Sequence, residues 1–185
     1  MFYLGIFSSY VLLSIVLCVK NRMEIIKHET SKISSFVDIE NSPRGTKLII
    51  GKNSLIDSFV KIKPVGGKGN ISIGDNSDIN SNCVLYSGNG ITIGNNVLIA
   101  AGCIFASTSH AYCKKNKTIR EQRFLPSKGG ILIEDDVWIG AGTVILDGAK
   151  IRKGSVIVAQ SLVIGETPEY SISGGNPIKV MNFRS

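Results

Sequence analysis

One histidine is the main candidate for chemistry in this sequence. His110 is one of two histidines in 185 residues, and it directly precedes residues 111–130, which hold six basic residues and one acidic residue. An imidazole titrates near neutral pH and can take a proton from a substrate as a general base. A lone histidine is more often structural than catalytic. Its position favours chemistry here, because long segments without regular structure are usually functional, although a solvated insertion has a similar composition.

The element that positions His110 is a six-residue repeat. Between residues 133 and 163 every sixth residue is a branched aliphatic, namely Ile133, Ile139, Ile145, Ile151, Ile157 and Val163. Three residues after these, turn-forming residues dominate: Asp136, Gly142, Gly148 and Gly154, with Gln160 and Glu166 as exceptions. A period of six fits neither an α-helix nor a two-sided strand. It predicts a chain that turns a corner every six residues, so that three sides make one coil of a β-helix.

The same repeat continues on the N-terminal side with interruptions. Coils are expected from Ile33 onwards, and His110 ends the hexapeptide that begins at Phe105. Residues 63–70 are expected to form a surface turn, and residues 87–90 shift the register by two. Asn76, Asn82 and Asn96 fall at corners, where asparagine tolerates a left-handed conformation. The prediction is an all-β parallel β-helix of about five coils over 33–172, with an excursion at 111–130, a lead-in at 1–32 and a tail at 173–185.

Charge and cysteine content limit the function. The chain has 21 basic and 14 acidic residues, a net charge of +7, which suits a membrane surface or a phosphate-bearing cofactor better than nucleic acid, because no nucleic-acid-binding module is recognisable. Four cysteines without a C-x-x-C pair, together with two histidines, predict no metal site. Cys83 and Cys103 lie one coil plus two residues apart and are expected to stack as buried thiols.

The N-terminal segment is apolar. Residues 2–19 carry no charge, and eighteen residues are close to the shortest helix that crosses a bilayer. Lys20, Arg22 and Lys27 follow and would keep the main domain in the cytoplasm by the positive-inside rule. The expectation is a hydrophobic helix that attaches a cytoplasmic protein to the membrane. The alternative is a helix packed on the β-helix or on a partner subunit.

Three motifs in order resemble the hexapeptide-repeat acetyltransferases of the maltose/galactoside, xenobiotic and polysaccharide O-acetyltransferase type. The motifs are Ser107-Thr-Ser-His-Ala111, Asp136-Val-Trp-Ile-Gly-Ala-Gly142 and Gly174-Gly-Asn-Pro-Ile-Lys179, and the resemblance covers about residues 48–182. It implies a left-handed parallel β-helix, acetyl-CoA as the acyl donor, and a homotrimer with active sites between subunits.

The resemblance also implies roles at the acceptor. It makes His110 the general base, places Asn80 in the acceptor pocket with Asn82 beside it, and puts Trp138 at the border of the active-site tunnel. Gly88 stands where relatives often have an aspartate that binds the acceptor sugar, so the identity of the acceptor stays open.

Further residues are implied at the donor. The positions expected to line the cofactor are Trp138, Gly140, Ala141, Ala159, Gly165 and Lys179. Backbone amides near Ala141 and Ala159 would receive the pantetheine arm. An N–H near Gly140 or Ala141 would stabilise the oxyanion of the thioester. Lys179 is the remaining cation for the phosphates, because Ile164 and Gly165 replace the Thr-Lys pair of relatives.

Together these features predict an acetyl-CoA-dependent O-acetyltransferase that acts on a sugar hydroxyl, in surface polysaccharide biosynthesis. The alternatives are an antibiotic-modifying enzyme of the same fold, an amino-sugar N-acetyltransferase and a non-catalytic β-helix that binds a partner. Ala111 disfavours the amino-sugar alternative, because some of those enzymes have an acidic residue directly after the histidine.

Overall fold

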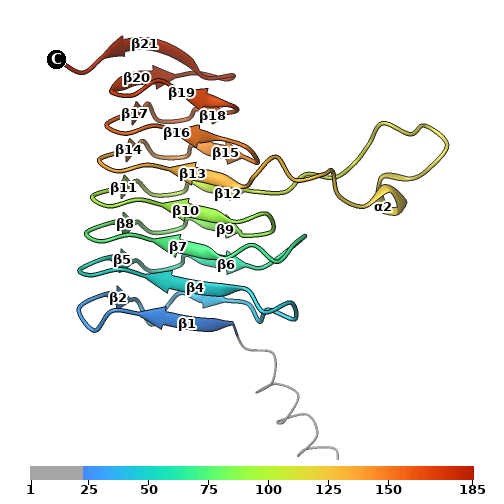
Figure 1. The fold of residues 1–185 in the computed structure, drawn as a ribbon, viewed down its shortest axis with the longest axis horizontal. Coiled ribbons are helices and arrows are strands. Elements are labelled where there is room, and N and C mark those ends of the chain that lie inside the picture. Colours follow the sequence, from blue (N-terminus) through green and yellow to red (C-terminus); the bar gives the residue numbers. More distant parts are fainter. Residues whose placement is uncertain (1–22) are drawn as a thin grey trace, which may run out of the picture.

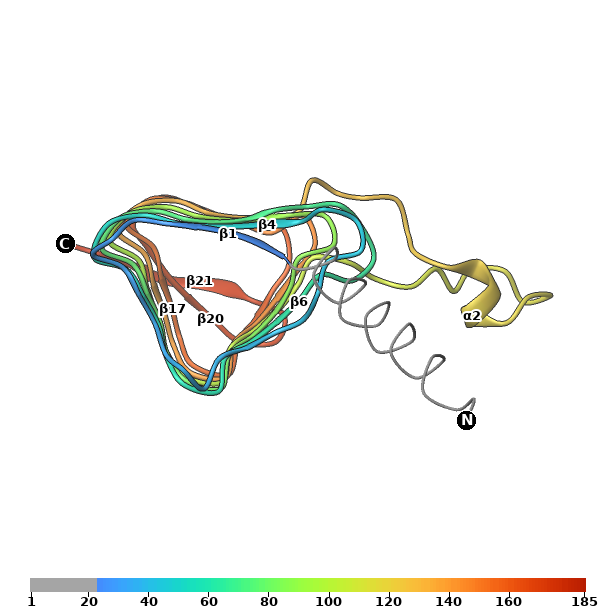
Figure 2. The ribbon, with the colours of Figure 1, turned by 90° about the horizontal axis from the view of Figure 1, so that it is seen from below.

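The computed structural model describes residues 23–185 as three parallel sheets that form a triangular prism (Figures 1 and 2). Sheet A contains β1 (Glu24–Lys27), β4 (Lys47–Ile50), β7 (Ile71–Ile73), β10 (Ile91–Ile93), β13 (Ile131–Ile133), β16 (Lys150–Ile151) and β19 (Glu166–Thr167). Sheet B contains β2 (Lys32–Ile33), β5 (Leu55–Ile56), β8 (Asp78–Ile79), β11 (Leu98–Ile99), β14 (Trp138–Ile139), β17 (Val156–Ile157), β20 (Ser171–Gly174) and β21 (Lys179–Phe183). Sheet C contains β3 (Asp38–Ile39), β6 (Lys61–Lys63), β9 (Val84–Tyr86), β12 (Ile104–Ala106), β15 (Val144–Leu146) and β18 (Leu162–Val163).

Each coil of the chain visits sheets A, B and C in turn, an arrangement consistent with the expected left-handed β-helix. Six coils are complete, and a seventh contributes only β19 and β20 before β21 turns back antiparallel on β20. The expectation of about five coils was therefore too low. The difference comes from the first coil and the incomplete last coil, where the aliphatic repeat is weakest.

The core is a column of inward-facing aliphatic side chains. Phe105 lies between Leu85 of the coil before and Ile145 of the coil after, in register, and all three side chains are fully buried. The six residues that define the repeat between 133 and 163 are buried as well. Burial of one large apolar side chain per side, from the second to the sixth coil, stabilises the stack.

The corners have the backbone conformation that the sequence predicted. Asn76, Asn82, Asn96 and Asp136 have φ between 52° and 61°, and Gly142 has φ of 68°. Gly148, Gly154 and Gln160 also have positive φ. Glu166 does not occupy such a corner, because it begins β19 and the positive φ falls one residue earlier.

The stacked cysteines are confirmed as a buried free pair. Cys83 and Cys103 directly precede Val84 and Ile104, which are paired in register in sheet C, and neither thiol is exposed. Contact with the Cys103 thiol and burial raise the pKa of Cys83. This thiol is therefore protonated at neutral pH and cannot act as a nucleophile.

The β-helix begins earlier than the repeat indicated. Expected as lead-in, residues 24–27 instead form β1, which pairs in parallel with β4 from Glu24 opposite Lys47 to Lys27 opposite Ile50. The repeat does not indicate β1, because Lys27 stands six residues before Ile33, where an aliphatic residue would be expected. The predicted hydrophobic helix at 2–19 lies outside the described residues. Within the described part of the chain, no helical segment has the length and apolar character that a bilayer crossing requires.

Candidate active site

The excursion leaves the prism at the corner between sheets C and A, which we call the C–A corner (Figure 2). It departs after β12 and returns at β13, close to the predicted limits of 111–130. Its two limbs pair at the neck: His110 and Phe124 form an antiparallel bridge, and Leu125 N–H donates to Ser109 O at 2.8 Å. His110 therefore lies at the point where the excursion joins the coils.

The neck orients the His110 ring through backbone and aromatic contacts. Nδ1 lies 3.1 Å from the carbonyl oxygen of Arg123, and the ring stacks on Phe124 with centroids 4.8 Å apart. A carbonyl oxygen can only accept a hydrogen bond, so Nδ1 carries the proton in this pair. In a neutral imidazole the free lone pair is then on Nε2, which is the arrangement a general base requires.

Arg123 has an unusual backbone conformation, with φ of 63° and ψ of −136°. Residues other than glycine rarely occupy this region, and such strain concentrates at functional sites. Its carbonyl accepts from Ala111 N–H at 3.0 Å and faces His110 Nδ1. The conformation of Arg123 thus aims one carbonyl at the neck of the excursion, where it positions the histidine.

The tip of the excursion is an ordered structure built around α2 (Ile119–Gln122). Thr118 and Glu121 form a capping box: Thr118 accepts from Glu121 N–H, and Glu121 accepts from Thr118 N–H at 2.8 Å. Hydrogen bonds from the Thr118 backbone and hydroxyl lower the pKa of Glu121. The T-x-x-E signature of this cap is present in the sequence, but the helix was not among the predicted elements.

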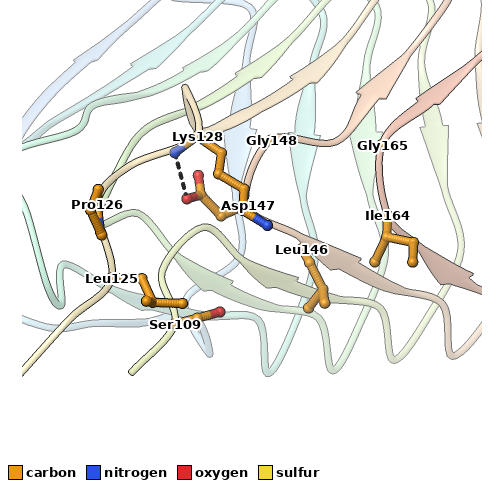
Figure 3. A pocket seen from close by; sticks show the side chains of 9 residues that line it. All are labelled: Ser109, Leu125, Pro126, Lys128, Leu146, Asp147, Gly148, Ile164 and Gly165. Atoms are coloured by element: carbon orange, nitrogen blue, oxygen red, sulfur yellow. Dashed lines mark hydrogen bonds between the residues drawn. The ribbon is translucent and has the colours of Figure 1, made fainter. Parts of the chain in front are cut away.

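Asp147 anchors the returning limb of the excursion (Figure 3). Its carboxylate accepts from Lys128 N–H at 2.9 Å, from Gly130 N–H at 3.0 Å and from Asn89 Nδ2 at 3.0 Å. A cavity of about 220 Å³ lies beside it, lined by residues that include Ser109, the neighbour of His110. Asp147 stands at a variable position of its hexapeptide, so the repeat pattern does not single it out.

We expect Asp147→Ala to loosen the returning limb without unfolding the coils. A carboxylate that accepts three hydrogen bonds stabilises the groups it contacts more strongly than a neutral acceptor does. Amide hydrogen exchange at Lys128 and Gly130 should become at least about tenfold faster. The matched control is Asp75→Ala, which removes a carboxylate that accepts from Lys52 N–H at 2.7 Å far from the excursion. Equal protection of both amides in wild type and Asp147→Ala would contradict this role.

Five of the other predicted residues lie at the corner between sheets B and C, which we call the B–C corner, on the third, fifth and sixth coils: Asn80, Asn82, Gly140, Ala141 and Ala159. Gly140 N–H donates to Ile157 O at 2.8 Å, which leaves the Ala141 N–H as the candidate of this pair for donating to an oxyanion. Ala141 and Ala159 differ, because within residues 23–185 their N–H groups donate to no acceptor. Both residues are exposed, so their N–H groups are the candidates at this corner for donating to a ligand.

Asn80 and Asn82 also lie at the B–C corner. The Asn80 amide donates to Ile99 O of the next coil at 2.8 Å, which ties its NH₂ group to the fold. Asn82 lies at the corner itself, with φ of 61°, and it is exposed. Of the two, Asn82 is therefore the one whose amide group is better placed to contact an acceptor.

Trp138, Gly165 and Lys179 lie in three different places. Trp138 is 54% exposed on the outer face of sheet B, between Leu98 and Val156 of the neighbouring coils. Gly165 lies at the C–A corner, where it lines the same cavity as Asp147 (Figure 3). Lys179 is exposed at the start of β21, opposite Gly174. In one chain, then, the candidate base and the free amides stand at opposite edges of sheet C.

Comparison with known proteins agrees with this architecture. Residues 130–165 match the family profile "Bacterial transferase hexapeptide (six repeats)", and residues 70–104 match "Hexapeptide repeat of succinyl-transferase". The putative acetyltransferase YJL218W of Saccharomyces cerevisiae is 32% identical over 168 residues, which cover 90% of this chain and 82% of that protein. The chain belongs to the hexapeptide-repeat acetyltransferase family and is an acyltransferase.

Two further relatives show how far the similarity extends. A 2,3,4,5-tetrahydropyridine-2,6-dicarboxylate N-acetyltransferase of Clostridium perfringens is 50% identical over 56 residues, 30% of this chain and 24% of that protein. Among solved structures, a mutant of AntD, an N-acyltransferase of Bacillus cereus, in complex with dTDP-4-amino-4,6-dideoxyglucose and coenzyme A, superposes with a TM-score of 0.72. That superposition covers 93% of this chain and 89% of AntD at 23% sequence identity, so it establishes the fold only.

Proposed function

We propose that this protein transfers an acetyl group from acetyl-CoA to a hydroxyl group of a saccharide, with His110 as the general base. The observation that carries this proposal is the hydrogen bond between His110 Nδ1 and the Arg123 carbonyl, which leaves Nε2 free to accept a proton. A sugar hydroxyl is a weak nucleophile and needs such a base, which contributes roughly 10²- to 10⁴-fold to the rate. A neutral amine is already nucleophilic and needs less assistance.

The free amides of the B–C corner support coenzyme A as the donor. Pantetheine carries two amide groups along its length, and its carbonyls would accept from the N–H groups of Ala141 and Ala159, one coil apart. The AntD structure contains coenzyme A, although it shares only 23% identity with this chain. Lys179, exposed on β21, supplies a cation for the cofactor phosphates.

A homotrimer would bring the two corners together, with the base from one subunit and the amides from its neighbour. The side chains of sheet C that point away from the core change from charged to apolar along the prism. In the first two coils they are charged, and Lys61 pairs with Asp38 and Glu40. In the next four coils they are largely apolar and partly exposed: Val84, Tyr86, Ile104, Ala106, Val144, Leu146 and Leu162. An apolar face that packs on a different face of a second copy closes into a ring when the rotation between copies allows it.

The chemical nature of the product tests the proposal. Pairs of saccharides that differ only by a hydroxyl or an amino group at one carbon should be offered together with acetyl-CoA, and free thiol measured. We expect acetylation of the hydroxyl compound, and the product should be cleaved by hydroxylamine, as esters are and amides are not. A hydroxylamine-resistant product formed only from the amino sugar would instead identify an N-acetyltransferase. No transfer to any saccharide would reject the proposal.

A further inference from the structure

The tip of the excursion, residues 112–122, carries four cations that the proposed reaction does not use. Lys114, Lys115, Lys117 and Arg120 are all exposed, and none of them forms an ion pair with any residue in the range 23–185. The one acidic residue of the tip, Glu121, is held by the capping box with Thr118. Four basic residues and one acidic residue give the tip a net charge of +3, and within the described part of the chain its cations form no ion pair.

Hydrogen bonds of the Gln122 side chain fix the backbone that carries these cations. Gln122 accepts from Lys114 N–H at 2.9 Å and donates to the carbonyls of Lys114 and Lys117, both at 3.0 Å. Gln122 directly precedes Arg123, whose carbonyl holds His110. The tip is thus preorganised, so a ligand that contacts it orders few additional groups on binding.

From this arrangement we infer that the acceptor saccharide carries a phosphate or diphosphate group, which the cations of the tip bind while His110 faces the acceptor hydroxyl. The inference rests on the proposed function. Several lysines around one rigid turn suit a compact, multiply charged anion, since an ammonium group binds phosphate as a point charge. The free amides proposed for the donor stand at the other edge of sheet C within one chain, and in the proposed trimer they come from the neighbouring subunit, so the experiment has to distinguish acceptor phosphate from donor phosphate.

The matched variants remove three positive charges each. The test variant is Lys114→Gln/Lys115→Gln/Lys117→Gln, which keeps the tip ordered because Gln122 bonds only to backbone atoms of Lys114 and Lys117. The control variant is Lys32→Gln/Lys52→Gln/Lys150→Gln, whose side chains are exposed on the coils and form no ion pair in the described residues. Both variants have the same net charge.

The probes are a nucleoside-diphosphate sugar, a farnesyl-diphosphate-linked sugar, inorganic pyrophosphate and a neutral methyl glycoside. Calorimetry measures binding without turnover, so this test stands even if the proposed acetyl transfer fails. We expect the test variant to bind the diphosphate sugars at least about tenfold more weakly than wild type, with the difference shrinking at high salt. The control variant should match wild type, and binding of the methyl glycoside should be unchanged. Stronger binding of the nucleotide or of the farnesyl compound identifies the source of the phosphate.

Three outcomes would overturn the inference. Wild-type protein that binds none of the phosphate-bearing probes would exclude a phosphate site. If the test and control variants lost affinity for the diphosphate sugars equally, the effect would come from the net charge of the protein and not from the tip. A selective rise in the KM for acetyl-CoA in the test variant, with acceptor binding unchanged, would assign the tip to the phosphates of the donor.

Discussion

His110→Ala is expected to lower kcat/KM for acetyl transfer by at least about 100-fold, because it removes the ring nitrogen that the neck orients to take a proton. The ring is exposed and stacks on Phe124, so the coils should fold normally. Acetyl-CoA binding should also persist, since the proposed donor contacts are at the B–C corner. Steady-state kinetics and calorimetry with acetyl-CoA measure both quantities.

His28→Ala is the matched control for this prediction. His28 is the other histidine of the chain, and its Nδ1 contacts Thr30 in a turn of the first coil. The control should keep wild-type activity. Retention of more than about a tenth of the wild-type rate by His110→Ala would be incompatible with a general base worth roughly 10² or more.

Phe105→Ala is expected to lower the free energy of unfolding by about 3–5 kcal/mol. Phe105 is the bulkiest of the fully buried side chains, and it fills the middle of the column between Leu85 and Ile145. Stacked β-strands relax little around a cavity, because each coil is held in register by the coils on both sides. Equilibrium unfolding in urea, at one fixed protein concentration, measures the loss.

The same substitution at an exposed phenylalanine provides the comparison. Phe36 is 66% exposed and packs against Phe59, with ring centroids 5.7 Å apart. Phe36→Ala should cost less than about 1 kcal/mol. If the two variants were equally stable, the inward column would not be the main source of stability in this fold.

The coils could be predicted from the sequence because each side repeats one simple requirement. An aliphatic at Ile133 or Ile139 and a residue that tolerates positive φ three positions later were enough to place both the core and the corners. Only the first side of the first coil, β1, was missed, because Lys27 occupies an inward register position there, and within residues 23–185 this strand has one neighbour, β4. The six-residue repeat of aliphatic residues is weak where a strand packs against a neighbouring coil on one side only.

The candidate site was predictable only in part, because its contacts link positions that no local pattern relates. The carbonyl that orients His110 belongs to Arg123, thirteen residues later, and it depends on a backbone conformation rather than on a residue type. Asp147 bonds to amides 17 and 19 residues earlier. The coil period of 18 could, however, have separated Gly165 from Ala141 and Ala159, since Gly165 is six residues past Ala159 and so falls at the next corner.

The reversed strand β21 has a consequence for how this protein associates. A β-helix has no intrinsic end, because the last coil presents the same unpaired N–H and C=O groups that every earlier coil offers to its successor. A first coil from another molecule would add in parallel, as all coils do here, yet β21 already occupies the free edge of β20 in the antiparallel direction. On sheet B, therefore, the chain itself covers the edge to which the first coil of another molecule would have to add in parallel.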